Sequence, residues 1–155
     1  MASDEYGDEY KETNYVQLEV WRANHEGGTK HYNAILLTDL STMKSVTINR
    51  WGRVGTLGEM KSFTHPDPRG AKRLFDAKIR EKAFNRGYNR AQEAIGPSKV
   101  LKGEVSKYVI AEELTEIIRA EGFLKVSEFM EPLEAPEPPK VEVYDYSADK
   151  EWGLF

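Results

Sequence analysis

The sequence at residues 49–55 is Asn49-Arg50-Trp51-Gly52-Arg53-Val54-Gly55. It continues a run of strand-forming residues that begins at Ser45, and side chains alternate between the two faces of a strand. We therefore expect Arg50 to share a face with the aliphatic Ile48, and Trp51 to share the other face with Arg53. An indole beside a guanidinium offers a stacking surface for a base or sugar and a bidentate partner for phosphate. The alternative is that Trp51 belongs to the core, where tryptophans in strands commonly lie.

Three stretches around this run also have the composition of strands. Residues 15–21 and 32–38 are rich in aliphatic and aromatic residues, and residues 59–64 follow a turn at Gly55-Thr56-Leu57-Gly58. Glycines supply the positive φ angles that tight hairpins need, and short turns favour antiparallel pairing of successive strands. The sequence predicts an antiparallel sheet of four strands, or slightly more.

A helix is predicted after the last of these strands. Asp67 is a suitable N-cap, and Pro68 is a suitable first helical residue. Apolar residues then recur every four positions, as in an amphipathic helix that covers one face of a sheet. These residues are Ala71, Phe75, Ile79 and Ala83. Gly87 follows where a left-handed residue is expected to end the helix, so the predicted fold class is α+β.

The Trp-Gly-Arg motif is part of a longer ordered pattern. It is preceded by Lys30-His31-Tyr32 and Leu36-Leu37, and it is followed by Gly58-Glu59, Lys61-Ser62-Phe63, the alanine-phenylalanine helix and Gly87-Tyr88. In this order and spacing, residues 14–90 resemble the WGR domain from end to end. The resemblance covers about half of the chain.

This resemblance implies a module that contacts DNA, known from the DNA-dependent poly(ADP-ribose) polymerases and from bacterial proteins. In those polymerases the tryptophan packs on the sugar at a DNA terminus near a 5′ phosphate, and the arginine links DNA contact to neighbouring domains. By position these residues are Trp51 and Arg53, and a lysine that contacts the backbone corresponds to Lys30. We expect Arg50 of the same motif to join them. The asparagine that precedes the lysine in some members is Thr29 here.

The distribution of charge agrees with a module that binds a polyanion. Residues 15–90 carry 14 Lys and Arg residues against seven Asp and Glu residues, a net charge of +7, whereas the flanking segments are acidic and bring the whole chain to −4. A basic centre between acidic flanks is typical of nucleic-acid binding with tails that interact or compete. Solvated surface charge is the alternative explanation.

Other functional classes lack support in the sequence. The chain has no cysteine, and its three histidines show no ligand spacing, so we expect no metal and no cofactor. The residues after Arg90 are too few for a catalytic ADP-ribosyltransferase fold and carry no phosphate-binding glycine loop, so we expect no enzymatic activity. Without a signal peptide or a long apolar run, the expected location is the cytoplasm, or the nucleoid in a bacterium.

The remaining segments receive separate predictions. Residues 1–13 are an acidic, disordered lead-in, residues 91–105 a linker, residues 106–131 a helical segment, and residues 132–155 a proline-rich spacer with an acidic-aromatic tail. A helix from Tyr108 to Glu121 either docks on the central domain or forms an arm for a partner. At the C-terminus, Trp152, Leu154 and Phe155 are expected to contact a protein partner.

Three functions are compatible with these observations. The leading hypothesis is a non-enzymatic protein of a bacterium or phage that binds DNA ends, nicks or breaks and recruits a partner through its tail. The second is an adaptor that uses the WGR sheet and the acidic tails to bind another protein, which the net acidity favours. In the third, the acidic-aromatic tail occupies the basic face until DNA displaces it. Whether Lys30, Trp51 and Arg53 are exposed together or covered by the helix at residues 108–121 separates the first two.

Overall fold

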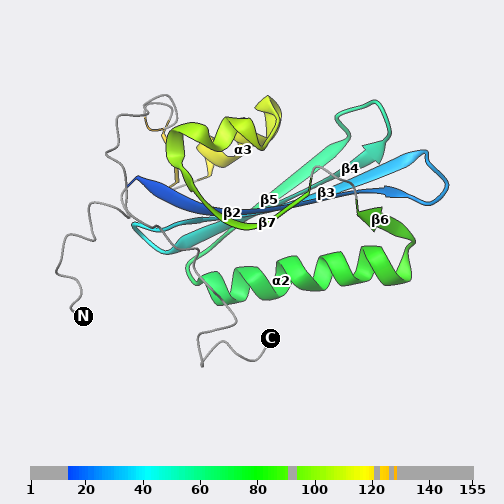
Figure 1. Ribbon diagram of the computed structural model, residues 1–155, viewed down its shortest axis with the longest axis horizontal. Coiled ribbons are helices and arrows are strands. Elements are labelled where there is room, and N and C mark those ends of the chain that lie inside the picture. The colour runs from blue at the N-terminus through cyan, green and yellow to red at the C-terminus, as the bar shows by residue number, and fades with distance from the viewer. Residues whose placement is uncertain (1–13, 91–93, 121–122, 126–127, 129–155) are drawn as a thin grey trace.

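A six-stranded antiparallel sheet lies between two helices in a computed structural model of the protein, which describes residues 14–90, 94–120, 123–125 and 128 (Figure 1). The strands are β2 (Tyr15–His25), β3 (Lys30–Asp39), β4 (Lys44–Arg53), β5 (Glu59–His65), β6 (Tyr88–Arg90) and β7 (Ile95–Leu101). The helices are α2 (Pro68–Arg80) and α3 (Ala111–Arg119). The predicted fold class is confirmed.

The strand order is β5-β4-β3-β2-β6, and β7 also pairs with β2. The outer edge of β2 is therefore shared, because β6 pairs with its C-terminal end and β7 pairs with its N-terminal half. The β4–β5 turn uses two positive-φ glycines, Gly55 at 93° and Gly58 at 78°. A Cβ atom at Gly58 would also overlap the carbonyl group of Trp51, so only glycine fits there.

Helix α2 begins as the sequence predicts, but its regular α-helical part ends at Arg80, before the expected stop at Gly87. The Asp67 side chain accepts a hydrogen bond from the backbone nitrogen of Arg69, and Pro68 is the first helical residue. The helix continues into a π-helical turn, η1 (Glu81–Asn85), before Gly87 adopts a φ of 78°. Ala71 and Phe75 are buried against the sheet, so the predicted apolar stripe is the packed one.

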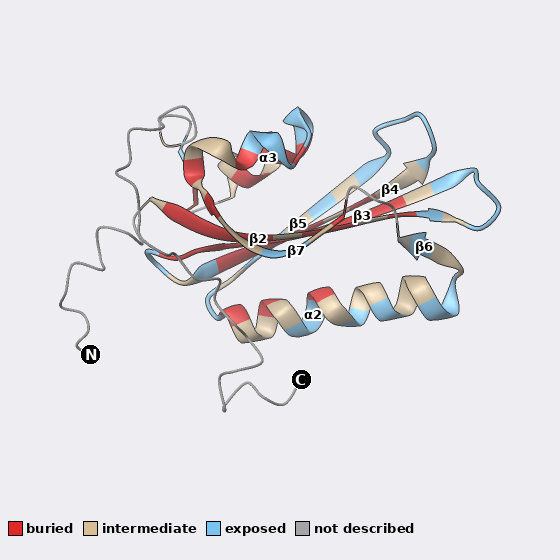
Figure 2. Ribbon diagram, in the orientation of Figure 1, coloured by how far each residue is buried: buried red, intermediate tan, exposed pale blue. Residues whose placement is uncertain are grey.

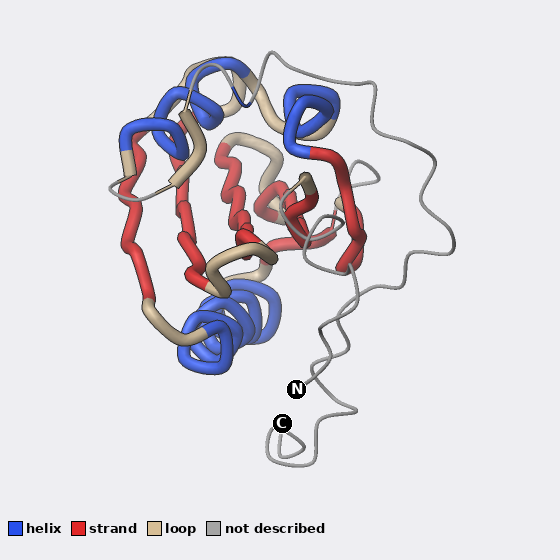
Figure 3. Tube along the Cα trace, turned by 90° about the vertical axis from the view of Figure 1, so that its left-hand side faces the viewer, coloured by secondary structure: helices blue, strands red, loops and turns tan. Residues whose placement is uncertain are grey.

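The two faces of the sheet carry separate hydrophobic clusters. Helix α3 covers one face, where it packs with β7 on aliphatic residues of β2, β3 and β4; this α3 face includes Val16, Leu18, Ile35, Leu37, Val46, Ile48, Leu114 and Ile117. Helix α2 packs on the other, the α2 face, whose buried residues include Trp21, Tyr32, Ala34 and Leu36. Figure 2 shows the buried central strands, and the end-on view in Figure 3 places α2 on one side and the other helical segments on the opposite side.

The prediction of a linker at residues 91–105 is wrong for residues 94–105, the part that the structure describes. Ile95–Leu101 forms β7, and Lys102–Lys107 forms a 3₁₀ helix, η2. Gly96 and Pro97 argued against a strand in the sequence, because both residues are rare in strand interiors. An edge strand tolerates proline, and β7 lies at the edge of β2.

The helix predicted from Tyr108 to Glu121 is present as the shorter α3, and it docks on the sheet. Phe123 and Leu124 are buried after it without helical structure, so the predicted helical segment at residues 106–131 is helical only in part. The lead-in at residues 1–13 and the spacer and tail at residues 132–155 lie outside the described residues. No helix in the described ranges is both long and apolar enough to span a membrane.

Candidate nucleic-acid interface

Two cross-strand pairs bring the predicted residues together on the α2 face. Trp51 pairs with Tyr32, and Arg53 pairs with Lys30 in the β3–β4 register. Paired residues point to the same face, and residues two apart on a strand do so as well. Trp51, Arg53 and Lys30 therefore share a face at the ends of β3 and β4.

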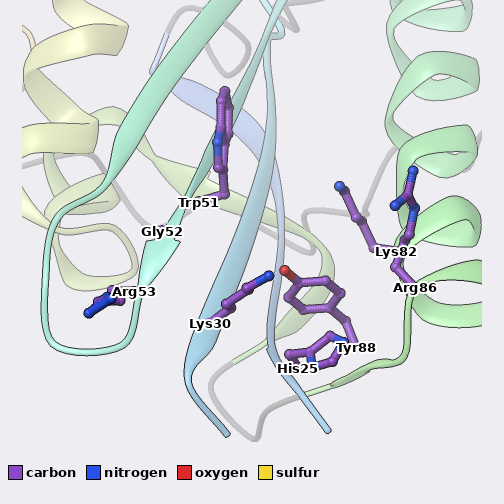
Figure 4. A pocket seen from close by; sticks show the side chains of 8 residues that line it. All are labelled: His25, Lys30, Trp51, Gly52, Arg53, Lys82, Arg86 and Tyr88. Atoms are coloured by element: carbon purple, nitrogen blue, oxygen red, sulfur yellow. The ribbon is translucent and has the colours of Figure 1, made fainter. Parts of the chain in front are cut away.

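These residues line an open pocket of about 490 Å³ together with side chains from three other segments. We call it the cationic pocket; its lining residues are His25, Lys30, Trp51, Gly52, Arg53, Lys82, Arg86 and Tyr88. Figure 4 shows Lys82 and Arg86 reaching from the helical side, Trp51 and Lys30 standing on the strands, and His25 and Tyr88 between them. The pocket forms where the last residues of β2 and β4 and the first residue of β3 meet η1 and the start of β6.

Trp51 lies at the boundary between the core and the cationic pocket. Its ring is nearly parallel to that of Tyr32, at 17° and with centroids 6.2 Å apart, and it packs against the cluster of the α2 face. The indole is only partly buried and also lines the pocket. One portion of the indole therefore packs against the core, and another portion is accessible in the pocket.

Positive charge in the cationic pocket is only partly neutralised by nearby carboxylates. Lys30 and Arg53 are exposed, and neither forms an ion pair within the described part of the chain. Arg86 lies 4.0 Å from Glu81, which also pairs with Lys78, and none of the residues lining the pocket is acidic. A phosphate group entering the pocket would meet several cations and no carboxylate from its walls.

Lys82 lies on the helical side of the pocket, close to two aromatic rings. Its Nζ lies 4.7 Å from the ring centroid of Tyr32 and 5.9 Å from that of Tyr88. Burial lowers the pKa of Lys82, the charge of Glu81 opposes this, and the charges of Lys78 and Arg86 lower the pKa further. An anion beside Lys82 would favour its charged form, so bound phosphate and the lysine ammonium stabilise each other.

The structure separates Arg50 from the other predicted site residues. Arg50 lies on the α3 face, as strand alternation requires, and only 8% of its surface is exposed. Its Nε donates to Oε2 of Glu113 at 2.9 Å. The expectation that Arg50 contacts DNA is therefore corrected, because its guanidinium is buried and neutralised on the opposite side of the sheet from Trp51.

Four lining residues were missed by the sequence analysis. Lys82 and Arg86 are four residues apart and so share one side of a helical turn, a spacing visible in the sequence. The spacing does not show, however, that this side of the turn faces β4. His25 and Tyr88 form an edge-to-face pair, with centroids 5.2 Å apart, between strands far apart in the sequence.

The arrangement combines a partly exposed indole with a group of cations, which is the chemistry that proteins use to bind nucleic-acid backbones and stack on their bases or sugars. Within the residues that the structure describes, no group of three or more acidic or histidine side chains could hold a metal ion. A search of curated proteins finds no match to the chain. Residues 17–95, just over half of the 155 residues, match the family model of the WGR domain, so the protein belongs to the WGR domain family, whose defining domain binds nucleic acid.

Proposed function

We propose that the protein binds DNA at ends, nicks or breaks through the cationic pocket and leaves the DNA chemically unchanged. The observation that carries this proposal is that Trp51, Lys30 and Arg53 share one open surface with Lys82 and Arg86. Helix α3, which could have covered this surface, packs on the opposite face of the sheet.

An accessible indole beside cations favours a terminus over the interior of a duplex. Within a duplex, each base is covered on both sides by its neighbours, so an indole has no free base face on which to stack. At an end, nick or gap, a base or sugar face is uncovered and a phosphate stands nearby. Trp51 would pack on that uncovered face, while Lys30, Arg53 and Lys82 would bind phosphates.

The acidic-aromatic tail is proposed to recruit a protein partner to the bound DNA. Trp152, Leu154 and Phe155 end the chain after a proline-rich spacer, and aromatic anchors beside acidic residues suit a basic pocket with an apolar floor. These residues lie outside the described part of the structure. The adaptor hypothesis differs in that the WGR sheet itself would contact protein instead of DNA.

Fluorescence anisotropy with labelled DNA tests the proposal. The panel contains blunt, nicked and gapped duplexes, each with and without a 5′ phosphate, and a dumbbell duplex closed by loops at both ends. We expect at least tenfold tighter binding to the interrupted DNAs than to the closed dumbbell. Equal affinity for all of them would contradict end recognition, and no binding to any of them would favour the adaptor hypothesis.

A matched pair of lysine variants separates the site from general charge. Lys30 and Lys44 are both exposed and begin adjacent strands, but they lie at opposite ends of the sheet. Lys30→Ala is expected to weaken binding to interrupted DNA by about three- to tenfold, as loss of one phosphate contact implies. Lys44→Ala removes the same charge and should change affinity by less than about twofold. Equal losses would indicate that only net charge matters.

A further inference from the structure

Glu113 forms a buried polar centre on the α3 face, behind the cationic pocket. Its side chain is fully buried at the start of α3. Its carboxylate accepts hydrogen bonds from both terminal nitrogens of Arg22, at 3.0 and 2.8 Å, from Nε of Arg50 at 2.9 Å, and from the backbone nitrogen of Ile110 at 3.0 Å. Burial alone would raise the pKa of Glu113, but these hydrogen bonds and the charge of Arg22 outweigh it and lower the pKa.

Arg50 connects this centre to the β4–β5 turn directly. While its Nε is held by Glu113, its Nη1 donates to the carbonyl oxygen of Leu57 at 2.8 Å. Leu57 lies in the turn between the two positive-φ glycines. The planar guanidinium thus fixes the distance between the carboxylate on α3 and a backbone group of the turn.

Arg22 starts a second connection to the same turn. Its Nη1 donates to Oδ1 of Asn33 at 3.0 Å, and Nδ2 of Asn33 lies 2.9 Å from Nδ1 of His31. Nε2 of His31 lies 2.9 Å from the carbonyl oxygen of Thr56. Because the Asn33 oxygen accepts from an arginine, its amide nitrogen must donate to Nδ1, and the proton of the neutral His31 ring is assigned to Nε2, which donates to Thr56.

Both connections end on adjacent carbonyl groups of a turn that borders the cationic pocket. The turn follows Arg53 directly, and its Gly58 packs against the carbonyl group of Trp51. The backbone nitrogen of Val54 donates to Thr29, next to Lys30, at 2.9 Å. A displacement of the turn would therefore move the backbone that carries Trp51 and Arg53.

We propose that Glu113 is a positioning residue that holds the β4–β5 turn, and with it the Trp51 and Arg53 side of the cationic pocket, from the opposite face of the sheet. Glu113 lies beyond residues 17–95, the part that matches the WGR family model, so a segment outside the domain as matched sets the geometry of its binding surface. The inference rests on the proposed function for its effect on DNA binding, but not for its effect on the turn.

The test compares two glutamates of α3. Glu113→Gln keeps the shape of the side chain and removes its charge. Glu116→Gln does the same at a residue that also contacts the sheet, through Ser62 of β5 at 2.7 Å, without connecting to the turn. We expect Glu113→Gln to weaken binding to interrupted DNA by about five- to tenfold, and Glu116→Gln by less than twofold.

A second readout on the free protein does not depend on DNA. In backbone and indole NMR spectra, Glu113→Gln should shift or broaden the amide signals of residues 56–58 and the indole signal of Trp51, while Glu116→Gln leaves them in place. If Glu113→Gln does not fold, Arg50→Lys replaces it, because a lysine cannot bridge Glu113 and Leu57 at once. A folded variant whose turn signals are unchanged would overturn the inference. So would a folded variant that binds interrupted DNA as tightly as the wild type does. Failure of the wild type to bind DNA would overturn the proposed function alone.

Discussion

On the α3 face of the sheet, Arg22 and Arg50 are held by a buried carboxylate; on the α2 face, Lys30 and Arg53 have no acidic partner among the described residues. The faces differ because the acidic first turn of α3 places Glu113 against Arg22 and Arg50, whereas no carboxylate lines the cationic pocket on the α2 face. A shift of three residues along one strand, from Arg50 to Arg53, converts a buried structural arginine into an exposed one. The sheet thus uses positive charge for folding on one side and leaves it free for a ligand on the other.

Removal of Glu113 should disrupt the buried ion pairs on the α3 face and have the largest effect, a loss of stability. Glu113→Ala leaves two largely buried guanidinium groups without their carboxylate, and breaking a buried ion pair in this way costs about 3–5 kcal/mol of unfolding free energy. Urea denaturation followed by circular dichroism measures this cost. Glu116→Ala, at a partly exposed site on the same helix, is the control and should cost less than about 1 kcal/mol. Similar costs for both variants would mean that the polar centre adds nothing specific.

Acid should act on the same centre. Because the folded pKa of Glu113 lies below the ordinary value of 4.5, its contribution to stability is complete above that pH and is lost as the pH falls through the folded value. The stability of the wild type should therefore fall more steeply below pH 4.5 than that of Glu113→Gln, which cannot titrate. Parallel curves for the two proteins would contradict this account.

Salt should act mainly on DNA binding by the cationic pocket, which is the open part of the α2 face. If three to five phosphates are engaged, the logarithm of the binding constant should fall against the logarithm of salt concentration with a slope on the order of −3 to −5. Between 50 and 200 mM salt this corresponds to a loss of affinity of about 60- to 1000-fold. Anisotropy titrations measure the slope, and a slope near zero would remove the electrostatic basis of the proposal.

Trp51→Ala tests the stacking surface of the open face. It should weaken binding to interrupted DNA by about 1–3 kcal/mol, the usual cost of losing a base–aromatic contact, while the domain stays folded. Trp51→Phe keeps an aromatic ring and should recover part of the loss. If Trp51→Ala unfolds the protein instead, its contact with Tyr32 and the core is the main role of the indole.

Ending the chain at Pro139 should have the smallest effect on DNA binding. Residues 140–155 contain four acidic residues against Lys140 and Lys150. If the tail recruits a partner, its removal should change DNA affinity by less than about twofold and remove that partner from pull-downs. A gain of tenfold or more at low salt, with no partner lost, would show that the tail masks the open face.

Local patterns in the sequence predicted much of the open face. Strand alternation placed Trp51 and Arg53 on the same side, and the family pattern added Lys30. The Asp67-Pro68 start of α2 and the glycine after it follow from capping rules that involve only neighbouring residues. These features were predictable because their causes lie within a few residues of one another.

The ion pairs and the edge strand on the α3 side of the sheet were not predictable in the same way. The partner of Arg50 is 63 residues away, and no local signal connects Arg50 to Glu113. Alternation already placed Arg50 on the aliphatic face, but its membership of the Trp-Gly-Arg motif led to the expectation of DNA contact. Strand β7 was missed because its pairing with β2 outweighs the poor strand propensity of Gly96 and Pro97.

The shared edge of β2 also has a consequence for how the chain folds. Val16 in this first strand pairs with Val100, and Arg22 is bonded to Glu113, 91 residues further on. Contacts over such separations form slowly, since a long loop must close first. During synthesis, the outer edge of β2 cannot be fully paired until β7 has left the ribosome. Residues 17–95 and the segment after them should therefore fold late and together, with a single unfolding transition.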